Sequence, residues 1–126
     1  WEYWYGGRSR IHNCFNGVGS WFIQAAGGIL PDAAAPGFKH VILRPQLPQG
    51  VEWVKTSKQT PYGKVRSEWR VEGDKMIFDV EIPANATATF YAPAAAAECV
   101  VDGQSVKLTD NTLKLNSGAY QIVINK

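Results

Sequence analysis

The pattern of apolar and polar positions divides the chain into two parts with different periods. Between residues 12 and 26, apolar side chains recur three and four positions apart, and this spacing predicts a helix. The opposite side of the helix is apolar as well, because Trp21, Phe22 and Ile23 are consecutive. A helix that is apolar nearly all round normally lies inside a larger body, so we expect its packing partners to lie outside this chain. The residues on the main face are Phe15, Val18, Phe22, Ala25 and Ile29.

From residue 37 onward the pattern has a period of two, which is typical of β-strands with one buried face. Asp102-Gly103 lies between two such segments and is a strong signal for a tight hairpin turn. Eight or nine short strands with no helix among them predict an antiparallel β-sandwich, with Trp53, Trp69, Phe78 and Phe90 packed inside it. The predicted strands are 41–44, 51–56, 65–71, 76–82, 86–91, 99–101, 106–108, 113–115 and 121–124.

The two parts are joined by a segment with the composition of a linker. The pair Gly27-Gly28 is a stop signal for the helix, and the sequence PDAAAPG follows shortly after it. We therefore divide the chain into a helical segment (1–30), a linker (31–36) and a sandwich domain (37–126). Because the first residue is Trp1 and not a methionine, we expect the chain to have been cut from something longer.

Composition and charge exclude several classes of protein. The chain of 126 residues is long enough to bury a core, and 45% hydrophobic with 19% charged residues excludes a disordered chain. Thirteen basic and eleven acidic residues give a net charge of +2 with no concentrated basic run, so we expect no nucleic-acid partner. No apolar stretch approaches the roughly 18 residues of a membrane span, so we expect no membrane partner.

Motifs for metals, phosphates and common nucleophiles are absent from the sequence. Two cysteines cannot make a disulfide framework or a zinc site by themselves. Cys14 falls in the apolar helix and Cys99 in a strand, which are the usual places for inert thiols. The two histidines, His12 and His40, fall in different predicted parts. We therefore expect neither a metal nor a cofactor.

The residues with the most promising chemistry lie at the amino end, in the sequence WEYWYGG. Glu2 is surrounded by aromatic residues, among them Trp1 and Trp4, and His12 opens the helix that follows. Aromatic rings stack on pyranose sugars, and a carboxylate desolvated by such rings has a raised pKa suited to proton transfer. The alternative is that the rings are core residues and Glu2 is a surface charge. Spacing alone favours this second interpretation.

Several longer stretches resemble the end of the bacterial α-L-rhamnosidases, family 78 of the glycoside hydrolases. The stretches that carry the resemblance are WEYW, HNCFNGVGSWF, GGILPDAAAPGFKHVILRPQ, VEWVKTSKQTPYGKVRSEW and EIPANATATFYAP. The resemblance implies an (α/α)6 barrel that carries the active site and a C-terminal antiparallel β-sandwich packed against it. Residues 1–30 then correspond to the last segment of the barrel and residues 37–126 to the terminal sandwich.

The resemblance also implies an activity and roles for four residues. The parent enzyme is expected to release terminal α-L-rhamnose from glycosides or polysaccharides by an inverting mechanism. Glu2 matches the family's general base, while the general acid belongs to an upstream part of the barrel. His12 matches a histidine beside the sugar. Trp1 and Trp4 are candidates for sugar-facing rings, with a place in the barrel core as the alternative. Without the general acid and most of the pocket, the fragment alone is expected to be inactive.

Two further questions are left open by the sequence. The sandwich either braces the barrel without a ligand or binds carbohydrate through exposed aromatics such as Tyr62 or Tyr91, and we favour the structural role. The apolar residues 12–26 need a cover. Residues 1–30 are therefore expected to fold back on the sandwich, to pair with another copy of the chain through residues 12–26, or to stay disordered.

Overall fold

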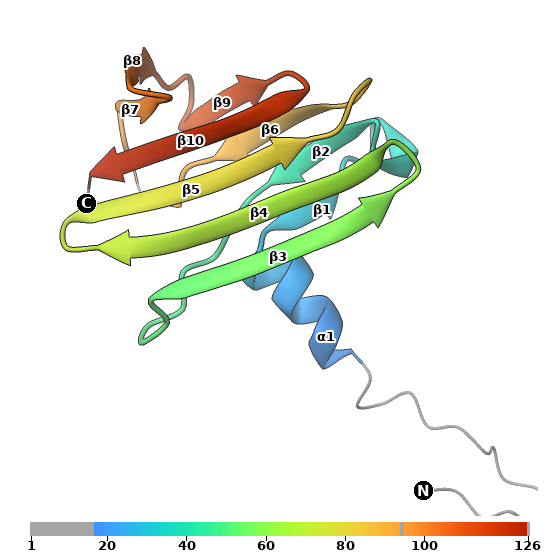
Figure 1. The fold of residues 1–126 in the computed structure, drawn as a ribbon, viewed down its shortest axis with the longest axis horizontal. Coiled ribbons are helices and arrows are strands. Elements are labelled where there is room, and N and C mark those ends of the chain that lie inside the picture. The colour runs from blue at the N-terminus through green and yellow to red at the C-terminus, as the bar shows by residue number, and fades with distance from the viewer. Residues whose placement is uncertain (1–16, 94, 126) are drawn as a thin grey trace, which may run out of the picture.

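The computed structural model describes residues 17–93 and 95–125, which form two β-sheets packed face to face (Figure 1). One sheet has four strands in the order β1-β2-β6-β9, and the other has six in the order β3-β4-β5-β10-β7-β8. The prediction of a β-sandwich is therefore confirmed, and each predicted strand from residue 41 onward has a counterpart.

The six-stranded sheet is antiparallel throughout. Its long central strands come from the clearest alternating segments of the sequence, and the Asp102-Gly103 turn joins the two short strands at one end of the sheet, β7 and β8. Both turn residues have positive φ, +49° and +85°, as the tightest hairpins require. The strands are β3 (Trp53–Thr60), β4 (Gly63–Glu72), β5 (Lys75–Ile82), β7 (Glu98–Val101), β8 (Gln104–Lys107) and β10 (Gly118–Asn125).

The four-stranded sheet contains one parallel pair, which corrects the expectation of an entirely antiparallel sandwich. Strands β2 and β6 run in the same direction because the chain crosses to the other sheet for β3, β4 and β5 before it returns. His40 in β2 links the pair, with its two ring nitrogens 2.6 and 2.9 Å from the hydroxyls of Thr87 and Thr89 in β6. The strands are β1 (Ile29–Pro31), β2 (His40–Leu43), β6 (Thr87–Tyr91) and β9 (Thr112–Leu115).

The core lies between the sheets and follows the predicted alternation on most strands. On β4 the side chains of Val65, Ser67 and Trp69 are buried, and their neighbours in the strand face outward. Phe78 of β5 and Phe90 of β6 meet edge to face across the two sheets, with ring centroids 5.1 Å apart. The predictions that Trp69, Phe78 and Phe90 pack inside the sandwich are confirmed.

Trp53 does not pack inside the sandwich, and its predicted core position is wrong. Its side chain is 63% exposed, because the residues of β3 that face inward are Val54, Thr56 and their alternate neighbours. In the sequence, Val51, Trp53 and Lys55 share one face of the strand, and Val54 lies on the other. Because both faces carry apolar side chains, the alternation does not show which face is buried. Trp53 therefore points into solvent.

The helical segment is shorter and more irregular in its described part than a single helix. It consists of α1 (Val18–Trp21) and the π-helical turn η1 (Phe22–Ala26). The predicted stop at Gly27-Gly28 is confirmed: Gly27 caps η1, and Gly28 has a φ of +70°. Ile29, expected on the helix face, is instead the first residue of β1 and is buried in the core.

The predicted linker 31–36 overlaps with regular structure. Pro31 ends β1, an isolated bridge joins Asp32 to Ala35, and the 3-10 turn η2 (Pro36–Phe38) follows. The division of the chain at residues 30 and 36 stays a prediction, and its first boundary falls within β1.

Two side chains of β4 bind the end of the helical segment to the six-stranded sheet. The indole Nε1 of Trp69 donates a hydrogen bond of 2.7 Å to the carbonyl of Ala26, and the hydroxyl of Ser67 donates one of 2.6 Å to the carbonyl of Gly27. Gly27 lies so close to Thr56 of β3 that any side chain at this position would collide with the threonine. The helix therefore ends against the inner face of β3 and β4.

Two backbone donors complete the same attachment. The amide of Gln46 donates to the carbonyl of Ala25 (2.9 Å), and the amide of Arg44 donates to the carbonyl of Gly28 (2.8 Å). The last carbonyls of a helix have no partner within the helix. Here four consecutive carbonyls, 25–28, all accept hydrogen bonds from the sandwich, so the direction of the helix is fixed relative to both sheets.

Replacement of the buried tryptophan tests this attachment. Trp69→Phe removes the indole N–H and leaves the Ala26 carbonyl buried without its donor, and we expect a loss of about 1–3 kcal/mol in the free energy of unfolding from this effect alone. The exposed Trp53→Phe is the matched control, with an expected change within about 0.5 kcal/mol. Urea unfolding measures both variants, and equal effects at the two positions would contradict the attachment.

Candidate functional site

The residues predicted to carry catalysis lie outside the described residues. Glu2, His12, Trp1 and Trp4 all fall in 1–16, as does Cys14, so their roles stay predictions. The described part of the chain presents two other surfaces: the exposed side of the helical segment and the outer face of the six-stranded sheet.

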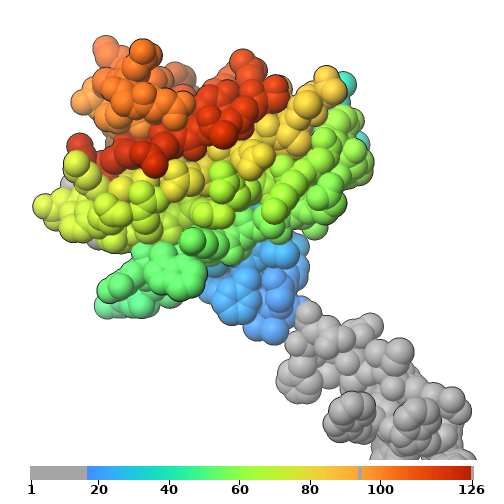
Figure 2. Space-filling view, in the orientation of Figure 1, coloured from blue at the N-terminus to red at the C-terminus, as the bar shows by residue number. Residues whose placement is uncertain are grey.

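The exposed side of the helical segment is apolar. Val18, Trp21 and Phe22 are 65%, 46% and 53% exposed, and the rings of Trp21 and Phe22 meet edge to face with centroids 5.3 Å apart. On the other side of the segment, Ile23 packs against the core and Ala26 is buried. Figure 2 shows the segment protruding from the sandwich beside β3. We call Val18, Trp21 and Phe22 the helix patch.

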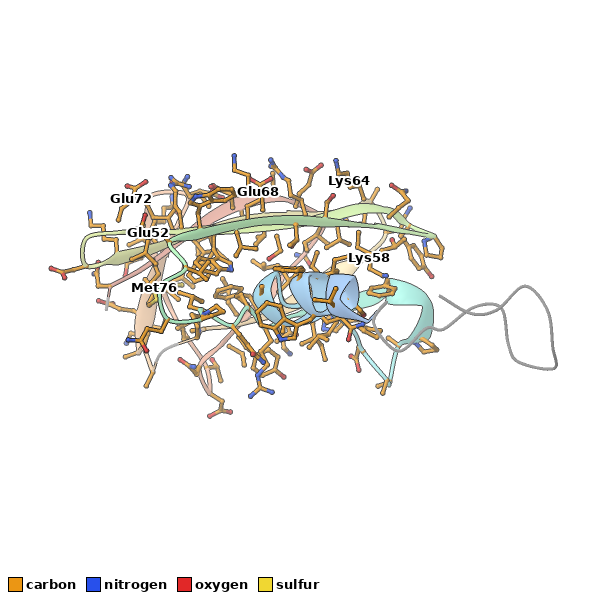
Figure 3. The ribbon with its side chains drawn as sticks, turned by 90° about the horizontal axis from the view of Figure 1, so that it is seen from below. Glu52, Lys58, Lys64, Glu68, Glu72 and Met76 are labelled. Atoms are coloured by element: carbon orange, nitrogen blue, oxygen red, sulfur yellow. The ribbon has the colours of Figure 1, made fainter. Side chains whose placement is uncertain are left out.

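The second surface is a groove of about 420 Å³ over β3, β4 and β5. Its floor includes Val54, Trp69 and Val71, whose side chains turn toward the core, so these residues contribute backbone atoms. In Figure 3, Glu68 and Glu72 point away from the second sheet, whereas Met76 lies on the other side of the strands. The outward side chains around the groove are Trp53, Lys55, Glu68, Arg70, Glu72 and Asp79. We call this surface the outer groove.

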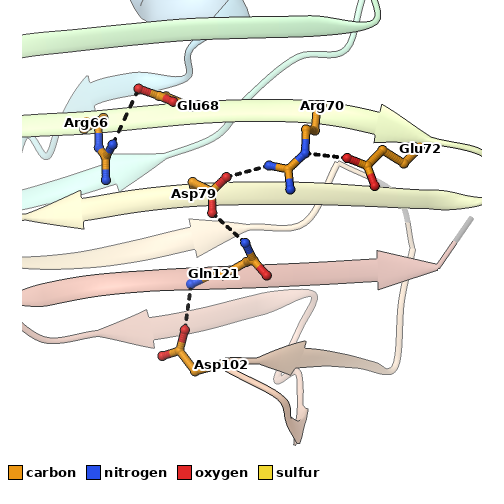
Figure 4. Close-up of polar contacts among 7 residues, drawn as sticks. All are labelled: Arg66, Glu68, Arg70, Glu72, Asp79, Asp102 and Gln121. Atoms are coloured by element: carbon orange, nitrogen blue, oxygen red, sulfur yellow. Dashed lines mark hydrogen bonds and ion pairs between the residues drawn. The ribbon is translucent and has the colours of Figure 1, made fainter.

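A network of charged side chains orders one wall of the outer groove (Figure 4). Arg70 donates from Nε to Glu72 Oε1 and from Nη1 to Asp79 Oδ2, both at 2.6 Å. The other oxygen of Asp79 accepts a bond of 2.9 Å from the side-chain Nε2 of Gln121, and the backbone N–H of Gln121 donates to Asp102 Oδ1 at 2.8 Å. Hydrogen bonds to Glu72 and then Asp79 raise the pKa of Arg70, so this guanidinium stays charged.

A second arginine lies further along β4. Arg66 Nε is 3.3 Å from Glu81 Oε2, although it is not aligned for a hydrogen bond, and Arg66 Nη1 is 3.8 Å from Glu68. Exposed ion pairs of this kind contribute about 0–1 kcal/mol each. The ion pairs of Arg66 and Arg70 thus add little to the stability of the fold, and their main effect is to hold these side chains in defined positions.

The two tyrosines considered for carbohydrate binding do not form a common platform. Tyr62 is 37% exposed in the turn between β3 and β4, whereas Tyr91 belongs to β6 in the other sheet. The guanidinium of Arg44 lies 5.3 Å from the centre of the Tyr91 ring and covers it in part. The exposed aromatic residue that sequence analysis missed is Trp53, and the signal for it was the equal alternation of the two faces of β3.

The remaining candidate chemistry is limited within residues 17–93 and 95–125. These residues contain no group of three or more His, Cys, Asp and Glu side chains placed to hold a metal ion. None of the helices in this described part has the length and apolar character needed to cross a membrane. Cys99 is 3% exposed, and its burial raises the pKa of the thiol, as predicted for an inert cysteine in a strand.

Comparison with protein families and curated proteins gives consistent matches. The model of the bacterial alpha-L-rhamnosidase C-terminal domain matches residues 28–107. An alpha-L-rhamnosidase of Formosa agariphila is 30% identical over 129 residues, which cover 94% of this chain and 14% of the relative. An alpha-L-rhamnosidase of Alteromonas sp. is 28% identical over 116 residues, which cover 92% of this chain and 12% of the relative. The chain therefore spans about a seventh or less of these relatives' length.

Solved structures with the same fold also come from this group of enzymes. The alpha-L-rhamnosidase from Dictyoglumus thermophilum superposes with a TM-score of 0.77 at 19% identity, over 89% of this chain and 14% of that one. The Streptomyces avermitilis alpha-L-rhamnosidase, solved in complex with L-rhamnose, superposes with a TM-score of 0.77 at 22% identity. The superposition covers 90% of this chain and 11% of that one. At such identities the likeness establishes the fold.

The reactivity of Cys99 tests its burial. In a Cys14→Ser chain, Cys99 is the one cysteine left. Because the thiolate is the reactive form and the folded protein disfavours it, we expect DTNB to label Cys99 about 100-fold more slowly in the folded than in the urea-unfolded chain. Labelling of the folded chain at the rate of a free peptide thiol would show that β7 does not shield the sulfur.

Proposed function

Because the chain belongs to the family of bacterial alpha-L-rhamnosidase C-terminal domains, we propose that it is a C-terminal piece of an enzyme that releases terminal α-L-rhamnose from glycosides or polysaccharides. The observation that carries this proposal is the family match over 28–107, together with curated relatives named alpha-L-rhamnosidase. These relatives are far longer than the chain, so the activity proposed is that of the longer parent protein.

In this proposal the sandwich has a structural role. Residues 1–30 form the last segment of a catalytic (α/α)6 barrel, 31–36 a linker and 37–126 the terminal sandwich. The four carbonyl contacts at residues 25–28 support this role, because they set the direction in which the helical segment leaves the sheets. The helix patch then faces the rest of the barrel, where its exposed apolar side chains are covered.

The chemistry proposed for the parent is an inverting hydrolysis. Glu2 acts as the general base that activates a water, and an upstream carboxylic acid protonates the departing oxygen. Inverting enzymes keep such groups roughly 6.5–9.5 Å apart, so that the water fits between the base and the sugar. His12, Trp1 and Trp4 contribute to sugar binding, the tryptophans by stacking on the pyranose ring. The reaction needs neither a metal nor a cofactor.

The chain alone is proposed to be inactive. It contributes one carboxylate of the pair and the end of the pocket, so it lacks both proton delivery to the leaving group and most of the substrate positioning. Each of these effects contributes several powers of ten to the rates of hydrolases. The isolated chain consequently has no route to measurable hydrolysis, even where Glu2 is correctly placed.

Hydrolysis of an aryl α-L-rhamnoside tests the catalytic proposal. We expect the parent enzyme to release rhamnose, the isolated chain to release none, and Glu2→Gln to lower kcat of the parent by about 10³-fold or more, as loss of a general base does. Glu98→Gln, an exposed glutamate of β7, is the matched control and is expected to retain full activity. NMR of the first sugar formed reports the anomer, which inversion requires to be opposite to that of the substrate.

The outcomes of this experiment separate the parts of the proposal. An active parent with an unaffected Glu2→Gln variant would refute the role of Glu2 and leave the family activity standing. A well-folded parent that releases no rhamnose would refute the proposed activity itself.

The helix patch makes a second prediction for the isolated chain. With the barrel absent, its exposed apolar side chains favour pairing between copies, one of the outcomes expected for residues 12–26. We expect sedimentation to show concentration-dependent self-association, and Trp21→Ser with Phe22→Ser to leave a monomer. Tyr62→Ser, an exposed aromatic away from the patch, is the control and is expected to associate like the unaltered chain. A monomer at every concentration of the unaltered chain would contradict this prediction.

A further inference from the structure

Trp53 is a large aromatic side chain that lies outside the core of the sandwich. It is 63% exposed, while the other tryptophan of the sheets, Trp69, is 2% exposed. Trp53 lies opposite Arg70 in the register of β3 and β4, at the edge of the outer groove. An exposed indole beside a groove offers a flat apolar face that a ligand can cover.

The polar groups beside Trp53 are already held in place before any ligand arrives. Arg70 is fixed by two bonds of 2.6 Å, to Glu72 and to Asp79, and Asp79 is fixed in turn by Gln121. Side chains ordered in advance lose less conformational entropy when a ligand binds. Each of these carboxylates keeps lone pairs free to accept further bonds, and Lys55, two residues after Trp53 on β3, adds a donor. The groove therefore presents both donors and acceptors around one aromatic ring.

The charges of the outer groove select among classes of ligand. Its outward side chains include three carboxylates, those of Glu68, Glu72 and Asp79, and two cations, Lys55 and Arg70. This slight excess of acidic over basic groups disfavours nucleic acids and sulfated polysaccharides, which bind to basic surfaces. A protein partner with an apolar surface would desolvate these carboxylates at a large cost in free energy. The surface fits a neutral ligand that has both apolar faces and many hydroxyl groups.

We propose that the outer groove binds neutral pyranose sugars, with one ring stacked on the indole of Trp53 and its hydroxyls bonded to Glu72, Arg70 and Lys55. A pyranose ring has a face of C–H groups that packs on an indole, and its hydroxyls both donate and accept hydrogen bonds. The site stands on the outer groove, and its residues are different from the catalytic residues proposed above. It makes the sandwich a binding surface for a sugar chain as well as a support for the helical segment.

NMR titration of the 126-residue chain tests the proposal, with L-rhamnose, xylohexaose and cellohexaose as the probes. We expect saturable shifts in the indole N–H of Trp53 and in the backbone amides of β3 and β4 next to it for at least one of these sugars. Trp53→Ala is expected to weaken binding about tenfold or more, as loss of a central tryptophan contact does. Trp53→Phe keeps an aromatic face and is expected to retain part of the affinity.

Trp21→Ala is the matched control, because it also removes an exposed tryptophan but lies on the helix patch. It is expected to leave the affinity unchanged. The proposal is overturned by the absence of saturable shifts with all three sugars, by shifts centred on α1, or by binding that survives Trp53→Ala. Binding of heparin in place of the neutral sugars would overturn it as well.

The proposed function and this proposal fail independently. The parent's hydrolysis of a small aryl rhamnoside depends on Glu2 and its acid partner, so Trp53→Ala is expected to leave that rate unchanged. A parent that cleaves rhamnosides, with a chain that binds no sugar, refutes the outer groove alone.

Discussion

The four carbonyls at the end of the helical segment are the constraint on which the arrangement of this chain depends. A helix end buried without donors would leave these groups unsatisfied, at a cost of about 1–3 kcal/mol each. Here the sandwich supplies a donor for every one, from the side chains of Trp69 and Ser67 and from the backbone of the 44–46 segment. Both positions at the end of the helix require glycine. A side chain at Gly27 would collide with Thr56, and one at Gly28 would collide with the backbone at the Arg44–Pro45 bond. The carboxyl end of the helical segment is thus bound to the sandwich, whereas Val18, Trp21 and Phe22 before it expose apolar side chains.

The period of two along β4 links this attachment to the outer groove. Ser67 and Trp69 point inward and hold the helix, while Glu68 and Arg70 between and after them point outward and line the groove. One face of β4 therefore supports the helix, and the other face forms part of a polar surface. The two surfaces also differ in kind, because the helix patch is apolar and suits another part of a protein, whereas the outer groove is charged and suits a hydrated ligand.

The parts of the fold that depend on local patterns could be predicted from the sequence. Alternation placed Trp69 and Phe78 correctly inside the sandwich, the Asp102-Gly103 pair marked a hairpin, and Gly27-Gly28 marked the helix end. Features that depend on the partner strand could not be predicted in this way. The sequences of β2 and β6 themselves do not indicate that these strands pair in parallel. Three strands of the other sheet, β3, β4 and β5, separate them in the chain. The two faces of β3 were equally plausible, and only its register against β4 turns Trp53 outward.

The outer groove was missed for the same reason, since its residues come from three strands and gather only once the register is set. In the sequence, Arg70, Glu72 and Asp79 are ordinary charges on the outer face of strands. In the sheet they become a chain of hydrogen bonds that continues through Gln121 to Asp102. Pairs this exposed add little to stability, because water competes for each bond and the side chains lose entropy when they are held. The network's stronger physical consequence is order: it fixes donors and acceptors beside an exposed indole, where freely moving side chains would present no defined surface.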